Sequence, residues 1–230
     1  MKFSIIIPVH NEEKFIIDVL KRVNEQKKNF DLEIIISNDG STDETNNLLE
    51  KNKDLYDILV HSEVNYGKGS AIKKGLEKAS GDFTLIQDSD LEYNPNDYKK
   101  LFEPALNFKA DVVYGSRFLG GSYVRLHFFW HFLANKLLTI ISNIFTNLNM
   151  TDMETGYKLI KTEALKNINI QEKAFGIEPE ITIKLAKKKY IFYEVPISYE
   201  GRSYEEGKKI RLRDAFVAIF CIFKYAIFSK

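Results

Sequence analysis

The stretch Thr84-Leu-Ile-Gln-Asp-Ser-Asp-Leu-Glu92 decides how the rest of the chain is interpreted. Its apolar start predicts a buried strand, and the strand ends abruptly in three acids at a spacing of two, Asp88, Asp90 and Glu92. Carboxylate oxygens suit Mg²⁺ or Mn²⁺, which keep coordination positions open for phosphate oxygens. An isolated Asp-x-Asp is short and common, and by itself it is better interpreted as a solvated turn. The flanking sequence decides between the two.

The first half of the chain alternates between strand and helix patterns. Apolar runs predict strands over 3–9, 32–37, 57–61, 83–87 and 111–115, and helical patterns separate them. Short strand–helix connections predict the α/β class with a mostly parallel, doubly wound sheet, in which ligands bind beyond the carboxyl ends of the strands. Polar clusters follow the strands at those ends: 11–12, 39–43, 65–69 and 88–92. The acidic stretch is therefore one of several polar clusters at one sheet edge.

Each of these clusters also has a simpler explanation. Asp39 lies in a glycine-containing turn, where a carboxylate can accept hydrogen bonds from ribose hydroxyls or a base edge. Asn11 and Glu12 open a helix, and capping explains Asn11 equally well. Gly67-Lys68-Gly69 indicates either turn chemistry or a backbone approach to phosphate. Ser41 and Glu44 have capping-box spacing for the following helix. No Walker A loop is present, and no Gly-x-Gly-x-x-Gly follows the first strand, which counts against a dinucleotide-binding domain.

Composition excludes several classes of protein. The 230 residues are enough for one large domain, and a net charge of +1 gives no reason to expect a nucleic-acid partner. The single cysteine, Cys221, excludes an internal disulfide framework and fits a reducing compartment. The apolar start of the chain is broken by Pro8 and is too short for a signal peptide. No stretch reaches the ~20 apolar residues needed to span a bilayer.

Two stretches of the second half, 127–148 and 210–230, are unusually apolar. Polar residues in the first form a narrow helical stripe: His131, Asn135, Thr139, Ser142 and Thr146. Apolar residues of the second share one helical face, with basic residues nearby: Phe216, Ile219, Phe220, Phe223 and Ile227, with Lys208, Lys209, Arg211, Arg213, Lys224 and Lys230. Such helices either lie in a membrane interface, with cations on anionic headgroups, or pack on each other or on a partner chain such as a second copy. We favour peripheral attachment to the cytoplasmic face of a membrane, with a catalytic domain over 1–209 that includes helix 127–148, and an amphipathic helix over 210–230.

Ordered motifs give the chain a family resemblance. It resembles family-2 glycosyltransferases with the GT-A fold in five segments: Ser4-Ile-Ile-Ile-Pro-Val-His-Asn-Glu12, Asn38-Asp-Gly-Ser-Thr-Asp43, Asn65-Tyr-Gly-Lys-Gly69, Gln87-Asp-Ser-Asp90 and Gly115-Ser-Arg117. Two later segments, 151–158 and 201–209, are similar to the branch related to dolichol-phosphate mannosyltransferase. The resemblance covers nearly the whole chain, and five ordered motifs are far more specific than any one of them.

The resemblance implies a donor site for a nucleoside diphosphate sugar. The residues expected to bind it are Pro8, Asn11, Glu12, Asp39, Lys68, Asp88 and Ser89. Asp88 and Asp90 are expected to hold Mg²⁺ or Mn²⁺ on the diphosphate, which makes Asp90 catalytic. Glu92 stands where the family often has glutamine. Its direct ligation of the metal is left open.

The resemblance also implies an acceptor site. A polyprenyl phosphate is already anionic and needs cations to position it more than a base to deprotonate it. Arg117 and Arg202 are the expected catalytic cations, with ordinary surface arginines as the alternative. His131 and Asn135 are expected to complete the phosphate site. Asp152 and Glu154 lie where relatives with alcohol acceptors carry a base, and here we expect them to orient the sugar or an arginine.

Together these features predict an inverting transfer of a hexose, with mannose favoured, from a nucleoside diphosphate sugar to a polyprenyl phosphate. One alternative is a UDP-glucose-dependent enzyme with the same lipid acceptor or with a glycan hydroxyl as acceptor. An alternative of another class is a non-catalytic nucleotide-sugar-binding scaffold at a membrane, against which the intact acids argue.

Overall fold

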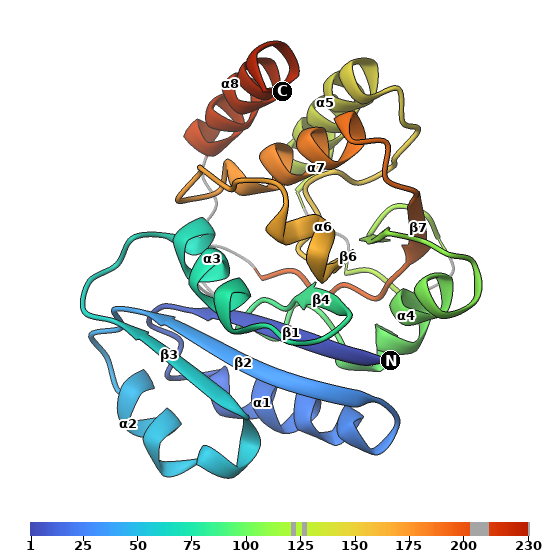
Figure 1. The fold of residues 1–230 in the computed structure, drawn as a ribbon. Helices are drawn as coiled ribbons and strands as arrows, with labels where there is room; N and C mark the ends of the chain where they lie inside the picture. Colours follow the sequence, from blue (N-terminus) through green and yellow to red (C-terminus); the bar gives the residue numbers. More distant parts are fainter. Residues whose placement is uncertain (121–122, 126–127, 203–211, 230) are drawn as a thin grey trace.

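A computed structural model describes residues 1–120, 123–125, 128–202 and 212–229 of the chain (Figure 1). Its centre is a seven-stranded sheet in the order β3-β2-β1-β4-β6-β5-β7. The strands are β1 Lys2–Val9, β2 Asp31–Asp39, β3 Ile58–Ser62, β4 Phe83–Ile86, β5 Val112–Ser116, β6 Lys158–Lys161 and β7 Phe192–Pro196. The helices are α1 Ile16–Glu25, α2 Thr45–Lys51, α3 Lys68–Lys78, α4 Tyr98–Asn107, α5 Phe129–Thr146, α6 Thr162–Lys166, α7 Ile177–Lys187 and α8 Leu212–Phe228. Short 3₁₀ helices span Gln26–Lys28, Lys53–Leu55 and Pro95–Asp97.

The parallel half of the sheet is formed by the first strands of the chain. β1 lies between β2 and β4 and runs parallel to both, and β3 runs parallel to β2. Helices α1 and α2 lie on one side of these strands and α3 on the other (Figure 1). Ile5, Ile6 and Ile7 are fully buried because both faces of the sheet are covered. The five strands expected from the sequence are all present, and their carboxyl ends lie at one edge.

Two further strands make the sheet mixed. β6 lies between β4 and β5 and runs antiparallel to both, and β7 forms the edge, parallel to β5. The sequence did not predict either strand. β6 has only four residues and leads directly into α6, so it is too short for a strand-like pattern of apolar and polar residues to be recognised in the sequence. The antiparallel strand brings Asp152 and Glu154, which precede it in the chain, toward the ends of β4 and β5.

Helices α5 and α8 pack against each other and on α7 at the top of Figure 1. Phe145 and Phe223 meet there, with ring centroids 5.2 Å apart. α5 begins two residues after the expected start, with residues 126 and 127 outside the described part, and ends where Asn147 adopts a left-handed conformation. The expected domain boundary at 209/210 also lies outside the described residues and stays a prediction.

The polar stripe of α5 faces the protein, and its apolar side faces outward. Thr139 and Ser142 are buried, and the Thr139 hydroxyl accepts a hydrogen bond from the amide of Met153. On the opposite side Trp130 and Ile144 are 74% and 73% exposed. α8 continues this surface with Phe216, Phe220 and Phe228. Among the described helices, none is long and apolar enough to cross a membrane.

Candidate active site

The strand ends bring the predicted donor residues together at one edge of the sheet. Pro8 lies within β1, opposite Ser37 of β2. Asn11 follows β1 with φ 53°, and its side-chain oxygen accepts a hydrogen bond of 2.8 Å from the amide of Thr42. The backbone amide of Asn11 donates to the hydroxyl of Ser41. The loops after β1 and β2 are therefore bonded directly to each other.

The predicted capping box at Ser41 and Glu44 is wrong. α2 begins at Thr45, and Glu44 precedes it without a side-chain capping hydrogen bond. The hydroxyl of Ser41 donates instead to Asn38, at 2.7 Å. The Ser41 hydroxyl is therefore used by Asn38 of the strand that it follows and by the amide of Asn11 from the neighbouring strand end, and not by the helix.

Asp39, at the end of β2, holds the turn formed by residues 65–69, which we call the glycine turn. Its carboxylate is 2% exposed and accepts hydrogen bonds from the amides of Tyr66, at 3.0 Å, and Gly67, at 2.6 Å. Gly67 has φ +101°, a backbone conformation that is strongly unfavourable for any residue with a Cβ atom. The two clusters that sequence reasoning placed at the sheet edge separately are thus one unit.

The glycine turn delivers Lys68 to the acid turn, residues 88–92. The ammonium of Lys68 lies 2.8 Å from Asp88 and 3.0 Å from Glu178 of α7. Glu178 also pairs with Lys158 of β6, at 3.2 Å. Sequence reasoning missed both residues as part of the site: Lys158 closes the segment 151–158 but received no role, and Glu178 lies outside every motif that was singled out. Both are buried, and burial of charge requires such pairing.

Asp90 and Glu92, the other two acids, share Arg202. The Arg202 guanidinium lies 2.5 Å from Asp90 and 3.4 Å from Glu92, and its Nη1 lies 3.9 Å from Glu12. Burial, followed by repulsion from Glu92 and Asp88, raises the pKa of Asp90 to about 7, although Arg202 opposes this. Ser89, between the acids, is buried. The turn therefore concentrates negative charge that two side-chain cations partly compensate.

The acids have the oxygen donors that a hard divalent ion requires. In the described part of the chain, however, no three His, Cys, Asp or Glu side chains are gathered so that they could hold a metal ion. Lys68 and Arg202 lie among the acids in the arrangement observed. Asp90 fits a cation site on its own chemistry, because a buried carboxylate with a raised pKa is stabilised by added positive charge.

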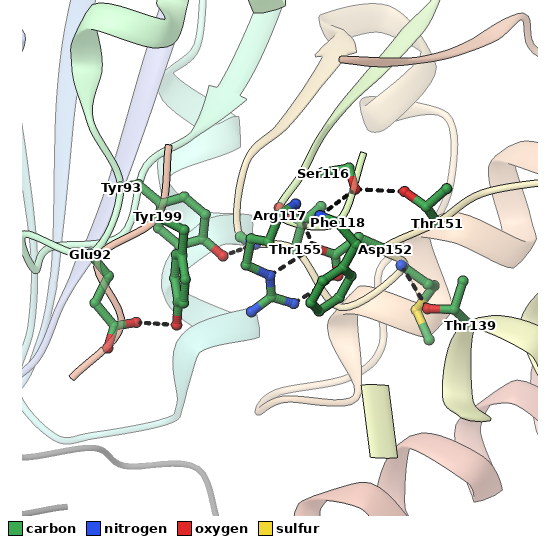
Figure 2. A network of polar contacts seen from close by, with 12 residues as sticks. Glu92, Tyr93, Ser116, Arg117, Phe118, Thr139, Thr151, Asp152, Thr155 and Tyr199 are labelled. Carbon is green, nitrogen blue, oxygen red and sulfur yellow. Dashed lines mark hydrogen bonds and ion pairs between the residues drawn. The ribbon is translucent and has the colours of Figure 1, made fainter. Parts of the chain in front are cut away.

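Arg117, just after β5, is held by Asp152 in a two-pronged ion pair (Figure 2). Both side-chain hydrogen bonds measure 2.7 Å, and the Arg117 amide donates to the same carboxylate at 3.0 Å. Its guanidinium carbon lies 5.1 Å from the centre of the Tyr199 ring. The Tyr199 hydroxyl donates to Glu92 at 2.9 Å. Tyr199, which sequence reasoning missed, therefore connects the arginine to the acid turn, and Figure 2 shows this row of side chains.

The remaining predicted residues are placed less tightly. His131 and Asn135 are half-buried on α5, with the ring of His131 against Phe128. Their part in a phosphate site stays a prediction. Lys136, the next residue on α5, is the one lysine, arginine or acid of this apolar helix. Its ammonium donates to the carbonyl of Thr151 and lies 4.7 Å from the centre of the Phe118 ring, beside Arg117.

Glu154 has an unusual environment. Its Oε1 is buried and accepts no hydrogen bond among the described residues. Burial, and then the charge of Glu178, raise the pKa of Glu154 to about 7, while Lys158 and Arg117 lower it. Such a carboxyl group exchanges a proton near neutral pH. It can therefore act as a base or as a hydrogen-bond partner for a hydroxyl.

The family model for glycosyl transferase family 2 matches residues 4–168. The chain belongs to this family. A dolichol-phosphate mannosyltransferase of Pyrococcus furiosus is 28% identical over 90% of the chain, and the chain spans 59% of that relative's length. An uncharacterized protein of Methanocaldococcus jannaschii is 31% identical over 89% of this chain and 93% of its own. A dolichyl-phosphate beta-glucosyltransferase of Trichomonas vaginalis is 28% identical over 99% of this chain and 73% of its own.

Solved structures that resemble this family 2 glycosyltransferase have the GT-A fold. Glucosyl-3-phosphoglycerate synthase from Mycobacterium tuberculosis, solved with Mn²⁺, uridine diphosphate and glucosyl-3-phosphoglycerate, superposes with a TM-score of 0.75 over 98% of this chain and 80% of its own, at 20% identity. The same enzyme with Mg²⁺ and uridine diphosphate gives a TM-score of 0.71 over 98% of this chain and 79% of its own, at 19% identity. The expected GT-A architecture is confirmed.

Proposed function

We propose that this glycosyltransferase transfers a hexose, with mannose favoured, from a nucleoside diphosphate sugar to a polyprenyl phosphate. The observation that carries the proposal is the row from the acid turn through Tyr199 to Arg117. It sets a cation suited to a phosphate one aromatic ring away from the acid turn, whose carboxylates suit a donor diphosphate. The two relatives named for dolichyl-phosphate chemistry support the choice of acceptor.

The donor half of the reaction rests on the acid turn. Asp88 and Asp90 would hold Mg²⁺ or Mn²⁺, with Glu92 beside them. When bound, such an ion neutralises charge on the departing diphosphate. Lys68, already against Asp88, is placed to contact the same diphosphate. Asp39 keeps the glycine turn closed beneath the nucleotide.

The acceptor half rests on the arginines. The acceptor phosphate oxygen attacks the anomeric carbon opposite the leaving diphosphate, which inverts the configuration and requires no covalent sugar–enzyme intermediate. Arg117, whose guanidinium is held in place by Asp152, orients the phosphate. Arg202 would bind the acceptor phosphate after its guanidinium leaves the ion pair with Asp90. His131 and Asn135 would complete this site from α5.

The surface of α5 and α8 supports a membrane location for the acceptor. Apolar side chains face outward along both helices, while the α5 stripe with Thr139 and Ser142 packs inward. A bilayer surface satisfies that orientation. Phe118, next to Arg117, contacts Phe132 of α5 with ring centroids 5.3 Å apart, so the phosphate site adjoins this surface. We place the protein on the cytoplasmic face of a membrane. Lys208, Lys209 and Arg211, expected to contact headgroups, lie outside the described residues, as does the side chain of Arg213.

A hydroxyl acceptor is the second candidate, and Glu154 favours it. A hydroxyl needs a base, and a carboxylate whose pKa is about 7 is suited to that task. A polyprenyl phosphate needs none.

One experiment tests both candidates. The protein is incubated with Mn²⁺ and either GDP-mannose or UDP-glucose, with a short polyprenyl phosphate or the matching polyprenol as acceptor. We expect product only with the phosphate, and Glu154→Gln should retain most of that activity. Transfer to a hydroxyl that disappears in Glu154→Gln would overturn the proposal in favour of the second candidate. Glu163→Gln, an exposed acid on α6, is the matched control.

A further inference from the structure

The glycine turn packs tightly against a segment from the second half of the chain. A Cβ atom on Gly67 would collide with the carbonyl oxygen of Lys173, and one on Gly69 with that of Glu172. The amide of Ser70 donates to the Lys173 carbonyl at 3.2 Å. Because only glycine allows this approach, the position of residues 172–173 determines the position of the turn.

The segment is in turn bonded to α7 and α8. On one side, the Glu180 carboxylate accepts hydrogen bonds from the amides of Gln171 and Glu172, at 2.8 and 2.7 Å. On the other, the Glu172 carboxylate accepts from Lys224 at 2.8 Å and from the Tyr225 hydroxyl at 2.6 Å. Burial alone would raise the pKa of Glu172, but the bonds from Lys224 and Tyr225 hold it below its ordinary value. Glu172 is thus ionised at neutral pH and bonded to α8.

The backbone of Gly176, just before α7, also approaches α8 closely. A Cβ on Gly176 would come within 2.7 Å of the Cys221 sulfur, so α8 packs directly on the start of α7. One turn along α8 from Cys221 lie Lys224 and Tyr225. A shift of α8 therefore moves residues 172–173, on which the glycine turn packs.

We propose that Glu172 is a positioning residue, which transmits the seating of α8 to the glycine turn and so sets the affinity for the nucleoside diphosphate. The inference rests on the proposed function in one respect, that the glycine turn borders the donor. The turn presents Lys68 to Asp88 and its amides to Asp39. Loosening residues 172–173 displaces both contacts without touching either carboxylate.

The test uses the full chain and measures the binding of UDP and of GDP by calorimetry in the presence of Mn²⁺, with no acceptor. The variant Lys224→Met/Tyr225→Phe removes both bonds to Glu172 and keeps the apolar packing of α8. We expect its dissociation constant for the bound nucleotide to rise about three- to tenfold. The matched control is Lys187→Met. Lys187 also bonds to the α8 end of the chain, through the carbonyl of Ser229, but does not touch residues 172–173. Its nucleotide affinity should equal that of the wild type.

A double-mutant cycle separates a specific path from general loosening. Gly69→Ala pushes directly on the Glu172 carbonyl, so its effect and that of Lys224→Met/Tyr225→Phe should not add. Additive effects, an unchanged affinity, or an equal loss in Lys187→Met would each overturn the inference. A melting temperature near that of the wild type shows that the fold is kept. If the wild type bound neither nucleotide, the donor assignment itself would fail, and the inference with it.

Discussion

The two halves of the site are built by different means. On the proposed donor side, Asn11, Asp39 and Asp88 lie where strands end, and the sheet register positions their backbone. On the proposed acceptor side, Arg117 also follows a strand, but its side chain and that of Arg202 are held by ion pairs with residues far away in the chain. Backbone placement is insensitive to one side chain, whereas a pair fails when either partner is lost. Donor chemistry should therefore depend on the charge of single acids, and acceptor chemistry on ion pairs.

The largest expected effect is on the donor side, in Asp90→Asn. Loss of one negative charge from the acid turn weakens the hold on a divalent ion, and we expect kcat to fall at least about a hundredfold. Initial rates with labelled nucleotide sugar measure it. Asp54→Asn, a change at an exposed acid, should leave the rate unchanged. Full turnover of the wild type in excess chelator would contradict the metal assignment.

A smaller effect is expected on the acceptor side, in Arg117→Lys. Lysine cannot make the two-pronged contact with Asp152, and we expect KM for the polyprenyl phosphate to rise roughly 10- to 100-fold, the equivalent of about 1.5–3 kcal/mol. Calorimetry of Arg117→Lys with UDP and GDP should give dissociation constants close to those of the wild type. Arg22→Lys, at an exposed position of α1, is the control and should match the wild type in both measurements. A collapse of nucleotide affinity would assign Arg117 to the diphosphate and remove the distinction between the two halves.

The apolar surface gives a third test, with a moderate effect. Phe220→Ser on α8 should weaken binding to anionic lipid vesicles about fivefold, since partial burial of one ring contributes roughly 1 kcal/mol. Phe220 is 65% exposed, and Phe108, 56% exposed near the end of α4, is the control that should not change. Trp130 is the single tryptophan of the chain and reports binding through its fluorescence. Equal vesicle binding by Phe220→Ser and wild type would indicate that α8 is covered by protein instead.

The smallest expected effect is a pH dependence of stability at Glu154. Its folded-state pKa of about 7 lies above the ordinary value of 4.5, so its contribution to stability is fully present below pH 4.5 and is lost as pH rises through 7. Glu154→Gln should therefore melt a few degrees above the wild type at pH 8, with the difference gone at pH 4.5. Glu33, on the parallel half, has the opposite shift, to about 2, through bonds from Lys2, Ser80 and Ser4 that outweigh burial. Glu33→Gln should therefore lower the melting temperature at pH 8. A difference between Glu154→Gln and the wild type that does not change with pH would refute the raised pKa of Glu154.

Prediction from sequence succeeded where the cause was local. Continuous apolar runs identified the first five strands, and strand ends identified the polar loops, because parallel topology gathers those ends. It failed where the cause was distant. Glu178 and Tyr199 carry no local signal, and their importance arises only when α7 and the segment after β7 reach the acid turn.

The same reasoning explains the error at Ser41. Capping-box spacing is a local signal. The Ser41 hydroxyl would bond to the helix amide only if no other partner competed for it. Asn38 competes from three residues earlier in the chain, and Asn11 competes because β1 and β2 are neighbours in the sheet. Lys136 offered a signal that was not used: one charge in an apolar helix needs a partner, and the Thr151 carbonyl and the Phe118 ring supply it.

The position of β6 has a consequence for synthesis on the ribosome. β1 to β4 can pair as soon as they emerge, but β5, residues 112–116, has as its partners in the described sheet only β6 and β7, both made later. Until residue 161 has been translated, β5 has neither neighbour and one edge of β4 stays open. Open strand edges invite pairing with other chains. During this interval the nascent polypeptide is exposed to wrong strand pairing, and the arrival of the four-residue strand β6 ends it for β4.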